Sequence, residues 1–344
     1  MAISRTGSNL SQIAALLGVS SATVSNALSG KGRVSAELTE KIRATAADLG
    51  YTPSLTGRAL RTGRTGVLGL VLPDIANPLF PQIAQAIEYA ASNAGYGVLI
   101  ADSRGNVALQ TDAINRLIER DVDGIIIVPR LGTRIADIDC PVAVIDSPST
   151  PGNTVSADHW QGGQAVVEHL VSLGHRKFLL IGNNPASNVQ NDRIGGMKSC
   201  VPEDGHADVL WIERHEQSHG KGSLLGLQKK VEAGFTAFAA ISDLHALRAL
   251  TELQRSGIAV PEDVSVTGFD DLVWSSVITP GLTTVRMNTA EIADVAIAAL
   301  VRVIEADAGS AIPAGPVVAA KRSSVPMQLV VRQTSGPPPK AQIA

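Results

Sequence analysis

Residues 10–54 of the chain read LSQIAALLGVSSATVSNALSGKGRVSAELTEKIRATAADLGYTPS. Apolar residues recur at helical spacing over residues 10–17, so this segment predicts a short helix. Gly18 can adopt a positive φ and Ser20 can cap a following helix. Together they indicate a tight turn into a second helix, which we expect over residues 21–28.

The second of these helices has the spacing of a helix that enters DNA. Val24 and Leu28 anchor it inward, which leaves a polar face outside, and the major groove is wide enough for one α-helix. Ser35 is placed to cap a third helix that ends near Leu49. Three helices of this kind predict a helix-turn-helix unit. On this segment alone, a helical hairpin without a nucleic-acid role is the alternative.

Charge separates this end of the chain from the rest. Residues 1–64 carry eight Lys or Arg and three Asp or Glu, whereas the remainder carries 21 basic and 29 acidic residues, so the net charge of −3 hides a basic head. A basic end on an acidic body indicates a polyanionic partner, although charged chain ends are often only solvated.

Cysteine content and hydropathy indicate the compartment. Cys140 and Cys200 are the only cysteines, so we expect neither a disulfide framework nor a metal site. The first residues show no apolar run before a small-residue cleavage site, and no stretch approaches the roughly 20 apolar residues of a bilayer span. These features predict a cytoplasmic protein that does not enter a membrane.

From Val67 onward, short apolar runs alternate with helical periods, which predicts parallel sheets built from right-handed crossovers. The strands are too many for one comfortable sheet, so we expect two similar lobes. The expected strands cover residues 67–72, 98–101, 124–128, 142–145, 178–181, 209–212, 237–241 and 264–267, and the helices include residues 79–93, 109–119, 161–173 and 244–255.

Motifs of catalysis are absent from the sequence. No Gly-rich dinucleotide fingerprint follows residues 67–72, and there is no Gly-Lys-Ser/Thr of a P-loop. We find no Ser-His-Asp order on a nucleophile elbow and no metal-ligand spacing. An enzyme is therefore disfavoured, and we expect no cofactor.

Residues 10–54 resemble the DNA-binding head of the lactose-repressor (LacI/GalR) family. The resemblance spans residues 9–333, through SLTGRALRTGRTGVLGLVLPDIANPLF, LVSLGHRKFLLIG, RIGGM and VPEDVSVTGFDD…TPGLTTV. It implies an α/β protein with an N-terminal three-helix helix-turn-helix head and two doubly wound parallel-sheet lobes of the periplasmic-binding-protein-like type. Such lobes also occur in periplasmic sugar-binding proteins, but the DNA-binding head distinguishes a transcription regulator from a protein of that class.

The resemblance also implies domain limits. The head would cover residues 1–53, a hinge helix and linker residues 54–65, and an effector-binding core residues 66–333. Lobe one would take residues 66–157 and 288–320, and lobe two residues 158–287 and 321–333. Residues 334–344 carry no core pattern, so we expect a disordered tail.

For the head, the resemblance implies contacts with a pseudo-palindromic operator by a homodimer. Leu60 would wedge between base steps from the minor groove, although it could instead pack against the third helix. Each polar position could also be a solvated surface residue. Base contacts fall on Ser21, Ala22 and Asn26, and phosphate contacts on Asn9, Thr23, Ser25, Arg33 and Arg58.

For the core, the resemblance implies an effector site between the lobes. Arg193 and Asp270 suit the hydroxyls of a sugar or a related polar metabolite, but they could instead pair with each other. For Asp74, the alternative to ligand binding is a role as a helix cap. No aromatic residue lies in residues 215–223 to stack on a ligand, so His215 or His219 could take that place or simply be exposed. The residues expected to bind the effector are Asp74, Asn77, Leu79, Phe80, Ser187, Val189, Arg193, Ser242 and Asp270.

Two functions of different classes remain on this reasoning. The first is a transcription regulator, commonly a repressor in this family, whose operator affinity a small molecule controls. The second is a small-molecule-binding protein with a vestigial head. The effector, the operator sequence and the sign of regulation stay open.

Overall fold

The computed structural model describes residues 10–29, 33–51, 63–306, 314–319 and 324–339. The chain divides into an N-terminal unit, Met1–Thr65, and a core, Gly66–Ala344. Three residues of the expected DNA site, Asn9, Arg58 and Leu60, lie outside the described residues, as does the expected hinge helix.

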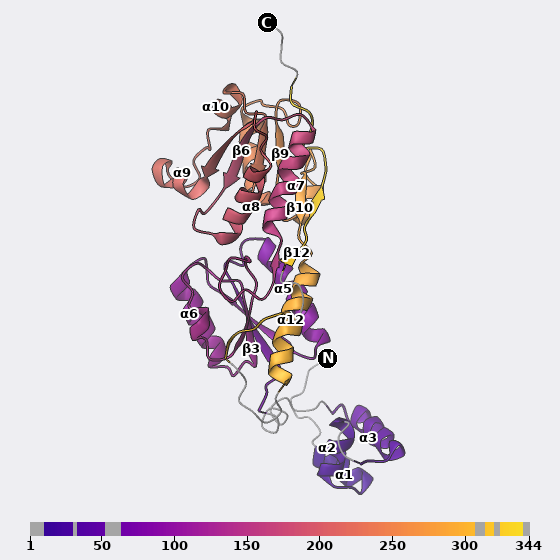
Figure 1. The fold of residues 1–344 in the computed structure, drawn as a ribbon. Helices are drawn as coiled ribbons and strands as arrows, with labels where there is room; N and C mark the ends of the chain where they lie inside the picture. Colours follow the sequence, from indigo (N-terminus) through magenta and orange to yellow (C-terminus); the bar gives the residue numbers. More distant parts are fainter. Residues whose placement is uncertain (1–9, 30–32, 52–62, 307–313, 320–323, 340–344) are drawn as a thin grey trace. The chain divides into compact units, whose positions relative to one another are not determined.

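The N-terminal unit contains three helices, α1 (Leu10–Leu17), α2 (Ser21–Ser29) and α3 (Ala36–Asp48), as Figure 1 shows. Gly18 adopts a φ of 64° in the turn between α1 and α2. Ser20 Oγ accepts a hydrogen bond from the Thr23 amide at 3.1 Å, and Ser35 Oγ accepts one from Leu38 at 3.3 Å. The predicted turn and both predicted caps are therefore confirmed. The buried residues that hold the helices together are Ile13, Ala14, Val24, Ala27, Ile42 and Ala46.

Lobe one of the core is a parallel sheet with helices on both faces. Its strand order is β11-β4-β3-β1-β2, with β1 (Val67–Leu72), β2 (Gly97–Asp102), β3 (Gly124–Ile127), β4 (Pro141–Val144) and β11 (Gly315–Pro316). Helices α5 (Leu79–Asn93) and α12 (Thr289–Glu305) cover one face, and α6 (Val107–Ile118) covers the other (Figure 1). Strand β1 is almost wholly buried because it lies between β3 and β2 under both helical layers.

Lobe two repeats this architecture. Its sheet has the order β7-β6-β8-β9, again parallel, with β6 (Lys177–Gly182), β7 (His206–Trp211), β8 (Ala237–Ala240) and β9 (Ser265–Thr267). Helices α7 (His159–Ser172) and α8 (Asn188–Ser199) pack on one face. The other face carries α9 (Ile212–His219), α10 (Leu227–Glu232) and α11 (Asp243–Arg255). Two doubly wound parallel sheets are the fold that the sequence predicted.

Short strands lie where the chain crosses from one lobe to the other. Strand β5 (Ser156–Ala157) pairs with β12 (Ser324–Val325), and β10 (Thr284–Arg286) pairs with β13 (Gln328–Val330). Two 3-10 turns complete the core, η1 (Ile135–Asp137) and η2 (Val273–Ser276). Because β5 leads into α7 and β10 into α12, these pairs join the two sheets into one body.

Close packing of α7 on α8 depends on glycine. A Cβ on Gly163 would lie 2.3 Å from the carbonyl oxygen of Arg193, and one on Gly196 would lie 2.1 Å from that of Trp160. No flexible side chain could yield there, because both neighbours are backbone atoms. The two helices can therefore approach this closely only without side chains at these positions.

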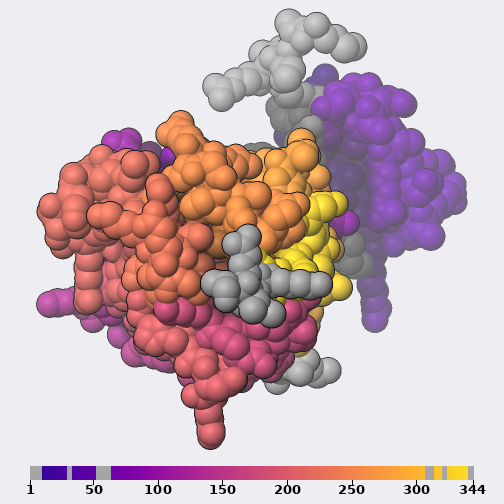
Figure 2. All heavy atoms as spheres, turned by 90° about the horizontal axis from the view of Figure 1, so that it is seen from above, coloured from indigo at the N-terminus to yellow at the C-terminus, as the bar shows by residue number. Residues whose placement is uncertain are grey.

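The C-terminal segment departs from expectation. Thr334 is fully buried, its carbonyl oxygen accepts a hydrogen bond from Val266, and its hydroxyl accepts one from the Thr283 amide. Ser335 and Gly336 bond to His169 and His175. Figure 2 shows this yellow segment between the orange and magenta parts of lobe two. The prediction of a disordered tail is therefore wrong for residues 334–339.

Some element limits also differ from those predicted. The strand expected over residues 209–212 runs His206–Trp211, and Ile212 begins α9. No helix within the described ranges is both long and apolar enough to cross a membrane.

Candidate DNA-binding and effector sites

One face of α2 is open and the opposite face is buried. Val24 and Ala27 are almost completely buried against the other two helices, whereas Ser21, Ala22 and Asn26 are exposed. At 3.6 residues per turn, the exposed three fall on one side of the helix, away from Val24. The predicted base-contacting residues therefore share one accessible face.

The other described residues of the DNA set lie beside this face. Thr23 and Ser25 are partly exposed on α2, and Arg33 is exposed just before α3. Thr23 Oγ1 also lies 2.9 Å from Ser20 Oγ, so its hydroxyl takes part in the helix cap. A phosphate contact by Thr23 would share that hydroxyl with the cap.

The core contains a cavity of about 1100 Å³ between its lobes. All nine residues of the predicted effector set line it, from four stretches of the chain that are far apart in sequence. Asp74, Asn77, Leu79 and Phe80 follow β1, Ser187, Val189 and Arg193 belong to α8 and its cap, Ser242 caps α11, and Asp270 follows β9. The carboxyl ends of parallel strands are the usual place for such a site.

The two walls of the cavity differ in chemistry. Lobe one contributes the apolar side chains Leu79, Phe80, Ile83, Val107 and Val128, together with charged ones at Asp74, Arg130, Arg134, Asp137 and Asp146. Lobe two contributes mostly polar side chains, among them Asn183, Asn184, Ser187, Asn188, Gln190, Arg193, Ser242, His245 and Asp270. A ligand held here can contact hydrocarbon from lobe one and hydrogen-bonding groups from both lobes.

Arg193 and Asp270 form the polar centre of this wall. Arg193 Nη1 donates to Asp270 Oδ1 at 2.9 Å and to the carbonyl oxygen of Ile241 at 2.6 Å. The guanidinium also lies over the Phe269 ring, 4.1 Å from its centroid. Burial raises the pKa of Asp270 to about 7, although Arg193 opposes this rise. The alternative in which the two residues pair is therefore confirmed, yet both also line the cavity.

His159, which the sequence did not single out, positions Arg193. It is buried at the first residue of α7, and its Nδ1 accepts a hydrogen bond from Arg193 Nε at 3.3 Å. Burial lowers the pKa of His159 well below its usual range, and the charge of Arg193 adds to this, while a hydrogen bond with the Asp146 backbone opposes it. A neutral ring can accept from Arg193 while its other nitrogen donates.

The loop that carries Asp270 is held rigidly. Asp270 has a φ of 107°, which is strained for any residue with a side chain. Buried Asp243 accepts from the Leu272 amide at 2.7 Å and from Ser275 Oγ at 2.6 Å. Asp271 accepts from Arg286 Nε at 2.6 Å and Arg332 Nη2 at 2.7 Å. These contacts fix the direction in which the Asp270 carboxylate points.

Polar contacts also join the lobes at the edge of the cavity. Thr150 Oγ1 donates to Asp146 at 2.5 Å and accepts from Asn188 Nδ2 of α8 at 3.1 Å. Ser147 Oγ donates to Asp192 of the same helix. Burial raises the pKa of Asp146 to about 6, with the charge of Asp192 adding to the rise and the Thr150 hydrogen bond opposing it. Asp146, Thr150 and Asn188 are further lining residues that sequence reasoning missed.

Two expectations about single residues are settled by their contacts. Asp74 Oδ1 accepts from the Ala76 amide at 2.9 Å, so it holds the turn before α5 rather than capping that helix. His215 and His219 stack on each other, with centroids 4.2 Å apart, and neither lines the cavity. The suggestion that one of them stacks on a ligand is therefore not supported, and Phe80 is the aromatic side chain of the cavity.

Comparison with known proteins places both units. Residues 9–54 match the family described as bacterial regulatory proteins, lacI family, and residues 167–335 match the periplasmic binding protein-like domain. The transcriptional regulator DegA of Bacillus subtilis is 30% identical over 81% of this chain and 86% of its own length. The chain belongs to the LacI family.

Two further relatives extend this. The ribose operon repressor of Haemophilus influenzae is 29% identical over 86% of this chain and 92% of its own length. The crystal structure of the Lac repressor dimer bound to operator and the anti-inducer ONPF superimposes with a TM-score of 0.76 at 26% identity, over 96% of this chain and 100% of that one. This LacI-family protein is therefore a DNA-binding transcription regulator and not an enzyme.

Proposed function

We propose that this regulator is a homodimeric, cytoplasmic repressor whose affinity for a pseudo-palindromic operator is controlled by a sugar or related polar metabolite. The single observation that carries this proposal is the cavity between the lobes, which all nine predicted effector residues line. The names of two similar proteins, a ribose operon repressor and a Lac repressor bound to operator and an anti-inducer, support repression as the mode of regulation and a sugar as the class of ligand.

The exposed face of α2 would contact DNA. Asn26 can pair bidentately with an adenine edge in the major groove, whereas Ser21 and Ala22 are small and would add little direct readout. Asn9, Thr23, Ser25, Arg33 and Arg58 would bind phosphates and set the register of the head. Leu60, in the hinge of residues 54–65, would enter the minor groove and bend the duplex.

Arg193 and Asp270 would anchor the effector. Their contacts use Nε and Nη1 of the arginine and Oδ1 of the aspartate. Within the described residues this leaves Nη2 and Oδ2 for ligand hydroxyls, and charge-assisted hydrogen bonds are the stronger kind. Asn77, Ser187 and Ser242 would complete the polar contacts, while Asp74 and Val189 border the site and Leu79 and Phe80 pack on a ring face.

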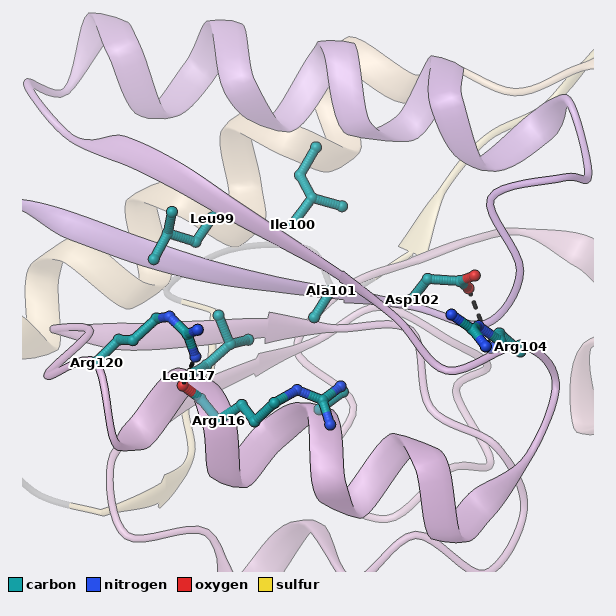
Figure 3. A pocket seen from close by; sticks show the side chains of 9 residues that line it. Leu99, Ile100, Ala101, Asp102, Arg104, Arg116, Leu117 and Arg120 are labelled. Carbon is teal, nitrogen blue, oxygen red and sulfur yellow. Dashed lines mark hydrogen bonds between the residues drawn. The ribbon is translucent and has the colours of Figure 1, made fainter.

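The edge of the lobe-one sheet offers a surface for dimerisation. Strand β2 is an edge strand, and its Leu99 and Ile100 are 39% and 54% exposed. Figure 3 shows these residues with Arg116 of α6 and Arg120, which follows that helix, beside the strand. An exposed apolar edge of this kind is unusual on a monomer. Pairing of the first lobes would cover it and would present two heads to two half-sites.

The domain limits support the same proposal. The division between Thr65 and Gly66 coincides with the end of the proposed hinge, so residues 1–53, 54–65 and 66–333 would act as head, hinge and core. Residues 66–157 with 288–320 and residues 158–287 with 321–333 would form the two lobes. Effector binding between them would alter the lobe angle and, through the hinge, the affinity for DNA.

Selection from random DNA followed by a mobility-shift assay tests the proposal. The full-length protein should enrich a palindromic site and bind it more tightly than bulk DNA at moderate salt, and a sugar or related metabolite should change that affinity. Binding that is equally weak for every duplex would contradict the DNA-binding part. An operator affinity that no small molecule alters would contradict the effector part.

A further inference from the structure

Charge is unevenly distributed around the cavity. His159 and His245 also line it, but burial lowers the pKa of both, so they stay neutral near pH 7. No lysine of the described residues lines the cavity. Its charged side chains are three arginines and five carboxylates, namely Arg130, Arg134, Arg193, Asp74, Asp137, Asp146, Glu213 and Asp270. Five carboxyl groups against three arginines leave the walls with an excess of negative charge even where Asp270, whose pKa is raised to about 7, is protonated.

Two of the three arginines already have carboxylate neighbours. Arg193 is bonded to Asp270 at 2.9 Å. Burial raises the pKa of Glu213, and the nearby charge of Arg130 opposes this. A phosphate placed beside either arginine would compete with the carboxylate that is there. The displaced carboxylate would remain in the wall without its cation, which is costly.

Helix N-termini offer an anion little more. The first turns of α8 and α11 border the cavity through their caps, Ser187 and Ser242. Ser187 Oγ accepts from the Gln190 amide at 3.4 Å, and Ser242 Oγ accepts from the His245 amide at 3.3 Å. Free amides at a helix start are what usually binds phosphate, and here side-chain hydroxyls occupy part of that capacity.

Two carboxyl groups of the cavity already experience an unfavourable environment. Burial raises the pKa of Asp270 to about 7 and that of Asp146 to about 6, and Asp192 adds to the rise at Asp146. A phosphate or carboxylate group bound in the cavity would add a negative charge that repels both carboxylates, because electrostatic interactions are strong where water is excluded.

Uncharged hydrogen-bonding groups are plentiful by comparison. Nine amide or hydroxyl side chains line the cavity: Asn77, Thr133, Thr150, Asn183, Asn184, Ser187, Asn188, Gln190 and Ser242. Lobe one also presents the Phe80 ring with Leu79 and Ile83. A molecule with hydroxyls along one edge and a C–H ring face on the other satisfies both walls.

We propose that the cavity takes its effector in uncharged form and discriminates against the phosphorylated or carboxylated derivative of the same molecule. This rests on the proposed function, because it concerns the same cavity. The discrimination follows from carboxylates that outnumber arginines and from arginines that already have acidic neighbours.

Matched pairs of compounds test this on the full-length protein. Ribose and ribose phosphate, glucose and glucose phosphate, and adenosine and its monophosphate are titrated by calorimetry, and each is added to the complex with the selected operator. At least one neutral compound should bind about tenfold or more tightly than its phosphate and should change operator affinity.

A phosphate that binds more tightly than its neutral partner would overturn the proposal, as would a protein that binds operator but no neutral compound. Failure to bind any operator would instead contradict the proposed function.

A variant that changes the charge of the cavity wall tests whether charge, rather than the shape of the cavity, causes the discrimination. Asp146→Asn removes a negative charge of the wall and leaves Arg193 and Asp270 in place. It should raise the affinity for phosphorylated compounds several-fold relative to their neutral partners. Glu203→Gln, at an exposed position away from the cavity, is the matched control and should leave the ratio unchanged. An unchanged ratio in Asp146→Asn would show that charge does not select the ligand.

Discussion

Arg193 and Asp270 form an enclosed ion pair in which Nη1 lies 2.9 Å from Oδ1 and the side chains are only 5% and 4% exposed. The pair spans the cavity wall from α8 to the loop after β9, and His159 accepts from the same guanidinium. Both members also line the cavity, so mutation can test their contribution to folding and their proposed contact with the effector separately.

Removing one member should destabilise the core more than removing both. Asp270→Asn leaves the charge of Arg193 buried without its partner, so the free energy of unfolding should fall by about 3 kcal/mol. The double variant Arg193→Met, Asp270→Leu should recover part of this loss while abolishing the effector response. Urea unfolding followed by tryptophan fluorescence measures the core alone, because Trp160, Trp211 and Trp274 all lie in it. Equal losses in the single and double variants would contradict the expectation.

Asn26→Ala should weaken binding to the selected operator by about 1–3 kcal/mol and relax the preference at one base pair of each half-site. The substitution removes hydrogen-bonding groups from the exposed face of α2 and leaves Val24 and Ala27 in their places. Ala44→Ser, on the exposed face of α3, is the control and should bind normally. An Asn26→Ala protein with unchanged affinity and unchanged base preference would exclude α2 as the reading helix.

Buried His245 should contribute stability that is lost between about pH 6.5 and pH 4, a contribution that the raised pKa values of Asp146 and Asp270 oppose. Burial lowers the pKa of His245 from 6.5 to about 4, with the charges of Arg248 and Arg193 adding to the shift. The unfolded chain therefore takes up a proton in this range that the folded chain refuses, so stability is present above pH 6.5 and is lost as pH falls.

The size of this effect is about 3 kcal/mol for a shift of this magnitude. In urea titrations at pH 7 and pH 4.5, His245→Asn should lose correspondingly less stability than the wild type. His219→Asn, at an exposed position, should behave as the wild type. A His245→Asn protein with the wild-type pH dependence would show that another group dominates.

Truncation at two positions should show which part of the C-terminus stabilises the core. A chain that stops after Gln333 loses Thr334, so the buried amides of Val266 and Thr283 lose their acceptors. Each such loss costs about 1–3 kcal/mol, and the melting temperature should fall by several degrees. A chain that stops after Pro339 keeps these contacts and should melt as the full chain does. Identical melting of both truncations would contradict this.

A charge on the β2 edge should disrupt the dimer. Ile100→Lys places an ammonium group in the proposed interface and should shift the sedimentation coefficient toward that of a monomer, with weaker operator binding as a consequence. Val331→Lys adds the same charge at another exposed apolar position and is the control. A dimeric Ile100→Lys protein would place the interface elsewhere.

The sequence predicted those features that short patterns encode. The caps at Ser20 and Ser35 are local, since each hydroxyl bonds to an amide three residues later. Alternation of strands and helices predicted the two sheets, whereas it was the resemblance to the LacI family that assigned Asp74, Ser242 and Asp270 to one cavity. Long helix α12 was not among the helices named from the sequence, although its buried residues recur at helical spacing along one face.

Other features depend on contacts between distant segments. His159 acts through Arg193 and the backbone of Asp146, and nothing in its own neighbourhood of the sequence indicates either partner. The prolines and small residues of the C-terminal segment suggest disorder when only side chains are considered. Thr334 is nevertheless held largely by its backbone carbonyl and amide, which bond to Val266 and Gly281, and backbone pairing of this kind leaves no pattern in composition.

Asp271 accepts hydrogen bonds from Arg286, at the end of β10, and from Arg332, just beyond β13. The neighbour of the carboxylate that we propose as a ligand anchor is thus tethered to the two strands beside which the chain passes from one sheet to the other. If a bound molecule displaces Asp270, we expect the displacement to reach that junction, so that occupancy of the cavity and the tilt of the two sheets change together.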